Sequence, residues 1–135
     1  MSLVARFGLD TSKIRRCICP SNVSIGHLVA IVGNQNGVET VDKADPVHYE
    51  RLPAVGMVIS KVDATTCLVQ FYGESSSIFN NLAPGEIYFL GKDSFISVVP
   101  PRPNGVDVFV QNVGVALSST TIFIKPDLNL VLRRS

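Results

Sequence analysis

The chain has 135 residues, which predicts a single domain, and hydrophobic residues make up 46% of it against 17% that are charged. A charged share below the usual quarter indicates either a large core or apolar surface that other chains cover. The net charge of +1 argues against a global basic field for nucleic acid, and the low, odd number of three cysteines excludes a disulfide scaffold.

The apolar runs are short, rich in Val, Ile and Phe, and separated by Gly, Pro, Asn and Ser, which is typical of strands and turns. The sequence predicts an all-β fold of about 8–10 short strands with almost no helix. Residues 1–16 are predicted as an extended N-terminal arm, 17–73 as a first half and 74–135 as a second half of one β domain. Strands are expected near residues 14–19, 27–32, 38–41, 55–62, 65–71, 86–90, 95–98, 108–117, 120–125 and 128–132.

The segments between the predicted strands carry recognisable turn chemistry. Asn-Gln-Asn-Gly at 34–37 tolerates positive φ, and the proline-rich stretch 100–105 is a stiff extended piece that ends in a turn. The longest irregular segment is 44–53, which contains His48 and Tyr49. A second polar loop is expected at 75–81.

Three landmarks occur twice in the same order, which indicates an internal repeat. Asn-Val-Ser-Ile-Gly at 22–26 corresponds to Asn-Leu-Ala-Pro-Gly at 81–85, and each precedes an apolar run. Val-Gly-Met-Val-Ile-Ser then corresponds to Val-Gly-Val-Ala-Leu-Ser, and each is followed by a Thr-Thr pair that opens another strand. Gly26 and Gly56 are 30 residues apart, and Gly85 and Gly114 are 29 apart.

Each half is expected to form a strand, an excursion and a hairpin whose apolar face needs a cover. Packing the halves face to face predicts a small, closed or nearly closed β-barrel or sandwich with pseudo-twofold symmetry. Gly56 and Gly114 lie at the starts of the hairpin strands, where a glycine often marks a bulge or a sharp bend.

Charge is divided unevenly along the chain. Residues 1–16 have a net charge of +3, residues 133–135 add +2, and residues 17–132 have a net charge of −4. Solvated tails tolerate Lys and Arg, which is one interpretation. The other is that basic termini dock on an acidic partner surface, such as the body of another copy.

The chain offers little for catalysis or for metal binding, and neither an enzyme activity nor a cofactor is expected. His48 and Glu50 could act in acid–base chemistry, but an exposed polar loop is the favoured interpretation. Cys17 and Cys19 share one face of an extended strand, yet a structural zinc site needs four ligands. Buried, reduced thiols from cytoplasmic synthesis are therefore expected.

Binding to nucleic acid, glycan or membrane finds little support. The acidic body and the absence of Trp argue against a nucleic-acid groove and weaken a glycan site, which Tyr49 and Tyr72 keep open. No secretory signal and no apolar run of membrane-spanning length are present in the sequence.

Four segments together resemble a family of viral proteins. They are Pro-Ala-Val-Gly at 53–56, Thr-Thr-Cys-Leu-Val-Gln at 65–70, Leu-Ala-Pro-Gly-Glu-Ile-Tyr-Phe-Leu-Gly at 82–91 and Gln-Asn-Val-Gly-Val-Ala-Leu-Ser at 111–118. This order is similar to small β-rich virion proteins of tailed bacteriophages, among them capsid decoration (cement) proteins and repeated β-domains of tail fibres. The resemblance covers about residues 22–125.

The resemblance implies a structural protein, made in the host cytoplasm, that sits as a homotrimer on the outer capsid surface. It would bridge subunits of the major capsid protein and stabilise the head, with no reaction catalysed. The arm would add a strand to the sheet edge of a neighbour. Partner contacts are expected from Leu3, Val4, Arg6, Phe7, Leu9, Lys13, Arg15, Arg16, His48, Tyr49, Arg133 and Arg134.

Two other functions stay open at this point. A tail-fibre or tail-spike β-domain would bind a host receptor or glycan through exposed aromatic residues on the loops 44–53 and 75–81. An enzyme would use His48 and Glu50. A chain that starts at Met1 and shows neither a heptad nor a collagen-like stalk favours the decoration protein over the fibre domain.

Overall fold

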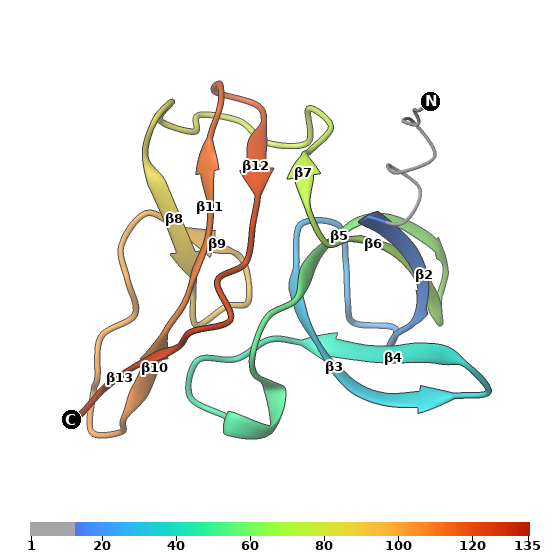
Figure 1. Cartoon of the computed structure of the whole chain (residues 1–135), viewed down its shortest axis with the longest axis horizontal. Coiled ribbons are helices and arrows are strands. Elements are labelled where there is room, and N and C mark those ends of the chain that lie inside the picture. Colours follow the sequence, from blue (N-terminus) through green and yellow to red (C-terminus); the bar gives the residue numbers. More distant parts are fainter. Residues whose placement is uncertain (1–12) are drawn as a thin grey trace.

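The computed structural model describes residues 13–135, and nearly all regular structure in this part is β-strand. It contains twelve strands and one short 3₁₀ helix, η2 (Tyr49–Arg51). The strands form a closed barrel, an open sheet beside it and a two-stranded ribbon (Figure 1). The predicted all-β fold with almost no helix is confirmed.

The first half closes into a barrel by itself. Its strands follow the ring order β2-β4-β3-β5-β6. The strand β2 closes the ring, because it pairs antiparallel with β6 and parallel with β4. Small and β-branched side chains of one buried cluster fill this first core: Cys17, Cys19, Val23, Val29, Val41, Val58, Cys67 and Val69. The strand bounds are β2 (Ile14–Ile18), β3 (Leu28–Gln35), β4 (Val38–Lys43), β5 (Gly56–Asp63) and β6 (Thr66–Gln70).

The second half forms an open five-stranded sheet and the ribbon. The sheet has the order β7-β12-β11-β8-β9, and the ribbon pairs β10 with β13. The ribbon and the C-terminus lie at the opposite end of the long axis from β2 (Figure 1). The bounds are β7 (Gly73–Glu74), β8 (Ile87–Leu90), β9 (Ile96–Ser97), β10 (Val108–Val110), β11 (Asn112–Ala116), β12 (Ile122–Ile124) and β13 (Val131–Arg133).

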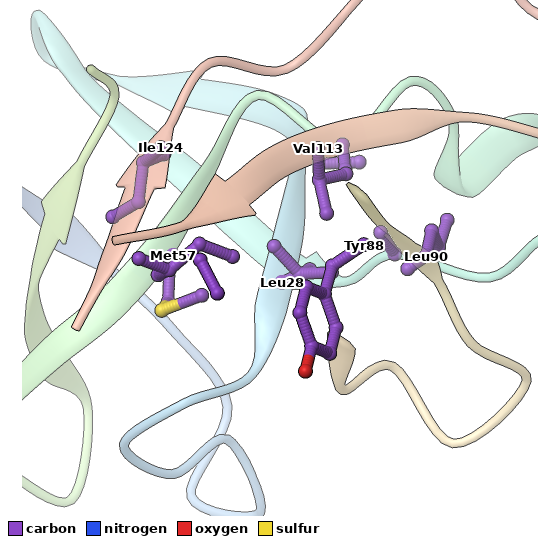
Figure 2. Close-up of a cluster of buried hydrophobic side chains, with 11 residues drawn as sticks. Leu28, Met57, Tyr88, Leu90, Val113 and Ile124 are labelled. Carbon is purple, nitrogen blue, oxygen red and sulfur yellow. The ribbon is translucent and has the colours of Figure 1, made fainter. Parts of the chain in front are cut away.

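A second core joins the barrel to the open sheet. Leu28 and Met57 on the outside of the barrel face Tyr88, Leu90 and other residues of the sheet (Figure 2). Burying side chains of this kind contributes roughly 1.5–3 kcal/mol each to folding. The same cluster includes Ala30, Ala44, Ala54, Val113, Ala116, Ile122 and Ile124.

The buried side-chain amide of Gln111 links the two halves by hydrogen bonds at one edge of this core. Gln111 is fully buried, and its side chain accepts a hydrogen bond from the Ala54 amide at 2.9 Å. The same side chain donates to the carbonyl oxygens of Ala54 at 2.8 Å and Asp127 at 3.0 Å. The predicted strand 108–117 divides at this residue into β10 and β11, because Gln111 turns its polar side chain into the core.

The internal repeat is visible in matched hydrogen bonds. Each of the turns 24–27 and 83–86 is closed by a backbone hydrogen bond. The His27 amide donates to the Ser24 carbonyl at 3.1 Å, and the Glu86 amide donates to the Ala83 carbonyl at 3.0 Å. The third residue of each turn is a glycine, with φ of +93° and +87°, as a type II turn requires. Both glycine amides also donate hydrogen bonds of 2.8 Å, Gly26 to the Val58 carbonyl and Gly85 to the Ala116 carbonyl.

The matched glycines of the hairpins are needed for close packing of strands. A Cβ atom on Gly56 would lie 2.6 Å from the carbonyl oxygen of Gln70. A Cβ atom on Gly114 would press on the carbonyl oxygen of Phe123. The pairing of β11 with β8 also shifts register just before Gly114, whose amide donates to the Asn112 side chain at 3.1 Å.

The predicted pseudo-twofold packing of the halves is wrong. In each half, three cross-strand partners form an outer row, which we define as 28-57-70 in the first half and 87-115-123 in the second. Leu28 and Met57 of the first outer row pack against the inner face of the second sheet, which carries Tyr88, Leu90, Ile122 and Ile124. The outer face of one half therefore meets the inner face of the other, whereas a twofold axis would bring two equivalent faces together. The reason is that β2 seals the interior of the first half, leaving only its outer row to be covered.

Candidate functional site

The loop 44–53 and the C-terminal ribbon, which the sequence singled out separately, meet on one surface. Tyr49 is 73% exposed, and its ring centroid lies 5.9 Å from that of Phe109 on β10. Phe109 is the cross-strand partner of Leu132 on β13, and Leu132 is 40% exposed. We name Tyr49, Phe109, Leu132 and Arg134 the ribbon patch. Arg133, which pairs with Val108, points to the other face of the ribbon.

Asp45 fixes the loop that presents Tyr49. Its carboxylate accepts a hydrogen bond from the Val47 amide at 2.9 Å and lies 2.7 Å from Nδ1 of His48. Burial works against ionisation, but the Val47 amide and the His48 ring together hold the pKa of Asp45 below its ordinary value. The short helix η2 follows at once, so the position of Tyr49 is defined by hydrogen bonds on both sides.

The ribbon is also tied down at its C-terminal end. Arg133 donates to the carbonyl oxygen of Pro101 at 3.2 Å, and the amide of Ser135 donates to Asp107 at 2.8 Å. Arg134 lies between them and is exposed. The ribbon patch is therefore an ordered aromatic and aliphatic surface with a basic margin.

The other predicted basic residues lie far from this patch. Lys13, Arg15 and Arg16 lie at or in β2, at the opposite end of the molecule (Figure 1). Arg15 bonds both carboxylate oxygens of Glu39, at 2.9 and 3.1 Å, and this bond lowers the pKa of Glu39. The Lys13 ammonium lies 4.9 Å from the centre of the Tyr72 ring.

The boundary of the predicted arm changes accordingly. Residues 14–16 belong to the barrel, because their backbone pairs with β6 from Ile14 to Ile18. The remaining predicted contact residues of the arm lie outside the described residues: Leu3, Val4, Arg6, Phe7 and Leu9.

The groups considered for catalysis or metal binding have structural partners. His48 contacts Asp45 and, within residues 13–135, shares no hydrogen bond with Glu50. Burial, together with the nearby Glu39, raises the pKa of Cys17 to about 11, so its free thiol is neutral and fills the barrel. In the described part of the chain, no group of three or more His, Cys, Asp or Glu side chains is placed to hold a metal ion.

His27 is likewise part of the fold. Its Nδ1 accepts a hydrogen bond from the Ser24 amide at 2.9 Å, and its ring stacks on Phe95 with centroids 4.2 Å apart. Burial, with a contribution from Lys43, lowers the pKa of His27. The ring is therefore held neutral, as a hydrogen-bond acceptor inside a turn.

Sequence reasoning missed a groove on the outer face of the second sheet. Its volume is about 480 Å³, and the second outer row lines it together with Lys125, Asp127 and Leu128. The available signal was the run Ile-Tyr-Phe-Leu of β8, which is apolar at every position. A strand that is apolar at consecutive positions is typical of a sheet covered on both faces.

No protein-family model matches the chain, and no curated protein or solved structure matches it either. Among the residues that the structure describes, no helix is long and apolar enough to cross a membrane. Function therefore has to be inferred from the surfaces of the molecule itself.

Proposed function

We propose that the chain is a virion structural protein, a capsid decoration protein that binds across subunits of the major capsid protein on the outside of the head. The observation that carries the proposal is the ribbon patch. Tyr and Arg are the residue types that most often dominate protein–protein binding energy. Here an exposed Tyr49, packed on Phe109, lies on the same surface as Leu132, with the exposed Arg134 at its margin.

The edge of the ribbon supports binding by strand addition. Within residues 13–135, β13 pairs with β10 alone, so its other edge carries no strand. Val131 at this edge is 61% exposed. An extended segment of a capsid subunit can add main-chain hydrogen bonds there, while Arg133 and Arg134 complement an acidic surface.

A non-catalytic role fits the state of the reactive groups. In the Asp45–His48 pair, 57% of the His48 side chain is accessible, and neither residue lines the groove on the outer face of the second sheet. Burial raises the pKa of Cys67 to about 12, with a hydrogen bond to Cys19 as a further cause. Neutral buried thiols and a solvated His–Asp pair give no nucleophile in a protected site.

A receptor- or glycan-binding tail module is the second candidate. It is favoured by the exposure of Tyr49 on the loop 44–53, since aromatic rings at loop tips stack on sugars. The loop 75–81 gives less support, because its Ile78 and Phe79 pack against the core between the two halves.

The test is binding of the purified chain to expanded heads of the phage that encodes it, followed by co-sedimentation. Tyr49→Ala and Arg134→Glu should each weaken binding by roughly 10-fold or more, as expected for hot-spot residues. Arg16→Glu is the matched control, because Arg16 is an exposed arginine of β2 at the other end of the molecule and, as part of the barrel, is no longer expected to contact the capsid. Equal losses for both arginine variants, or no binding of the wild type to heads, would overturn the proposal, and binding to a glycan array through Tyr49 would support the tail module instead.

A further inference from the structure

The outer face of the second sheet is an exposed apolar surface. Ile87, Val115 and Phe123 are direct cross-strand partners on β8, β11 and β12, so their side chains form one row. Ile87 is 47% exposed, and Val115 and Phe123 are partly exposed. Two more exposed side chains lie beside the row: Leu117 at 47% and Leu128 at 65%.

The equivalent row of the first half is buried. The Val58 amide donates to the carbonyl of His27 at 2.9 Å, and the Ala116 amide donates to that of Glu86 at 3.0 Å. These bonds align the two halves residue by residue, so that row 87-115-123 corresponds to row 28-57-70. The exposed fractions of Leu28, Met57 and Gln70 are 0%, 1% and 7%.

The comparison of the two rows shows what kind of surface covers such a face. Over the first row lies a twisted β-sheet of this same chain, whose Tyr88 and Ile124 side chains point toward Leu28 and Met57 (Figure 2). A stack of repeats usually ends in a unit with a polar outer face. Here the last sheet ends on an apolar row and a groove of about 480 Å³.

We infer that the second outer row is covered by the same row of a second copy, in a dimer with twofold symmetry. The inner face of the second sheet is already occupied and the first outer row is buried, so of the two matched rows only the second is left uncovered in each copy. The charges at its margin are self-complementary. Lys125 and Asp127 both line the groove, and Glu74 pairs with Phe123 at the end of the row.

A twofold contact closes on itself, because each copy uses its one exposed row and leaves none for a third chain. The dimer does not rest on capsid binding, which uses the ribbon patch, and the two can fail separately. It does differ from the homotrimer that the resemblance implies, since a ring of three needs a head-to-tail contact.

The experiment is sedimentation equilibrium on the full chain, with circular dichroism to verify folding. Ile87→Asp should raise the dimer dissociation constant by roughly 100-fold or more, because it places an unpaired charge in the apolar contact. Ile31→Asp is the matched control, since Ile31 on β3 is 45% exposed and lies outside the row. The control should remain dimeric.

A second variant keeps the test decisive if Ile87→Asp fails to fold. Val115→Cys places a thiol at the middle of the row, where two copies meet at the axis, and mild oxidation should link them into a covalent dimer. The three native thiols are buried and should not form this link. Ile31→Cys is the control, because it places a thiol outside the row and should give no covalent dimer.

Three results would overturn the inference. One is a monomeric wild type at concentrations of about 100 μM, far above the dissociation constants typical of specific complexes. Another is a wild-type trimer that Ile87→Asp disrupts, which would mean a head-to-tail contact. The third is a monomer that dimerises only after residues 1–12 are removed, since Lys13 borders a second groove that shares Phe123 with the first, and the N-terminal segment would then be the cover.

Discussion

The substitution Gly114→Ala tests whether the matched glycines are required by close packing. Gly114 is buried in β11, and an added Cβ would press on the carbonyl oxygen of Phe123 and lie 3.3 Å from Cδ1 of Ile122. The carbonyl belongs to the backbone of β12, the hairpin partner of β11. It cannot swing aside as a flexible side chain would, so the two strands have to separate locally.

The expected cost follows from two opposing contributions. Overpacking a buried site costs about 1–3 kcal/mol, and a clash with backbone belongs at the upper end of that range. Replacing a strand glycine by alanine recovers about 0.5–1 kcal/mol of backbone entropy. We therefore expect Gly114→Ala to lower the free energy of unfolding by about 2 kcal/mol, which corresponds to a Tm lower by about 8 °C in a chain of this size.

Urea unfolding followed by circular dichroism measures this change, and Gly33→Ala is the control. Gly33 also lies in a strand, but an added Cβ there meets only the Cβ of Thr40 at 3.8 Å, an ordinary contact. The control should be unchanged or slightly more stable. A Gly114→Ala protein as stable as the wild type, or a control that loses as much stability, would refute the close-packing explanation.

Two further predictions concern buried polar groups. Gln111→Leu should cost about 3 kcal/mol in urea unfolding, because it leaves the Ala54 amide and carbonyl buried without partners, and a loss below 1 kcal/mol would contradict this. For His27, the fold lowers the pKa below its ordinary value of 6.5, so the unfolded chain binds the proton first and stability should fall as pH drops from 7.5 to 5.5. His27→Gln should flatten that pH dependence, and an equally steep profile in the variant would assign it to other groups.

Much of the fold was predictable because it depends on local chemistry. The duplicated turns could be identified from glycines at positions 26 and 85, which have the positive φ that a type II turn demands. The strands between them were predicted from short apolar runs bounded by turn residues. β7 was missed because two residues, Gly73 and Glu74, carry no periodicity.

The arrangement of the halves depends on long-range pairing and was not predictable in the same way. A repeat indicates that two units share a fold, but not which face of one meets which face of the other. That choice is made by β2, which fills the first barrel with Cys17 and its neighbours and so leaves the outer row as the face to cover. In the second half β7 takes the place of β2, because it pairs with β12 as β2 pairs with β6, but it is only two residues long and lies at the edge of an open sheet. The duplicated sequence pattern therefore carried no information about the closing effect of β2.

The candidate site was predicted in part. The exposed Tyr49 and the basic Arg134 were identified by type and position, while Phe109, which connects Tyr49 to the ribbon, looked like any other apolar strand residue. Register decides that Phe109 stands between Tyr49 and Leu132. This register, the residue-by-residue pairing of β10 with β13, cannot be derived from a single sequence.

The closing strand of the barrel also determines how chains can be linked. The pairing of β2 with β6 joins residue 14 to residue 70. The barrel therefore closes only when the two ends of this long stretch of chain come together. Before closure, β4 and β6 are two bare edges that flank the apolar interior. A β2 strand supplied by another molecule satisfies the same hydrogen bonds as the chain's own, so crowded chains have a route to domain exchange at this seam.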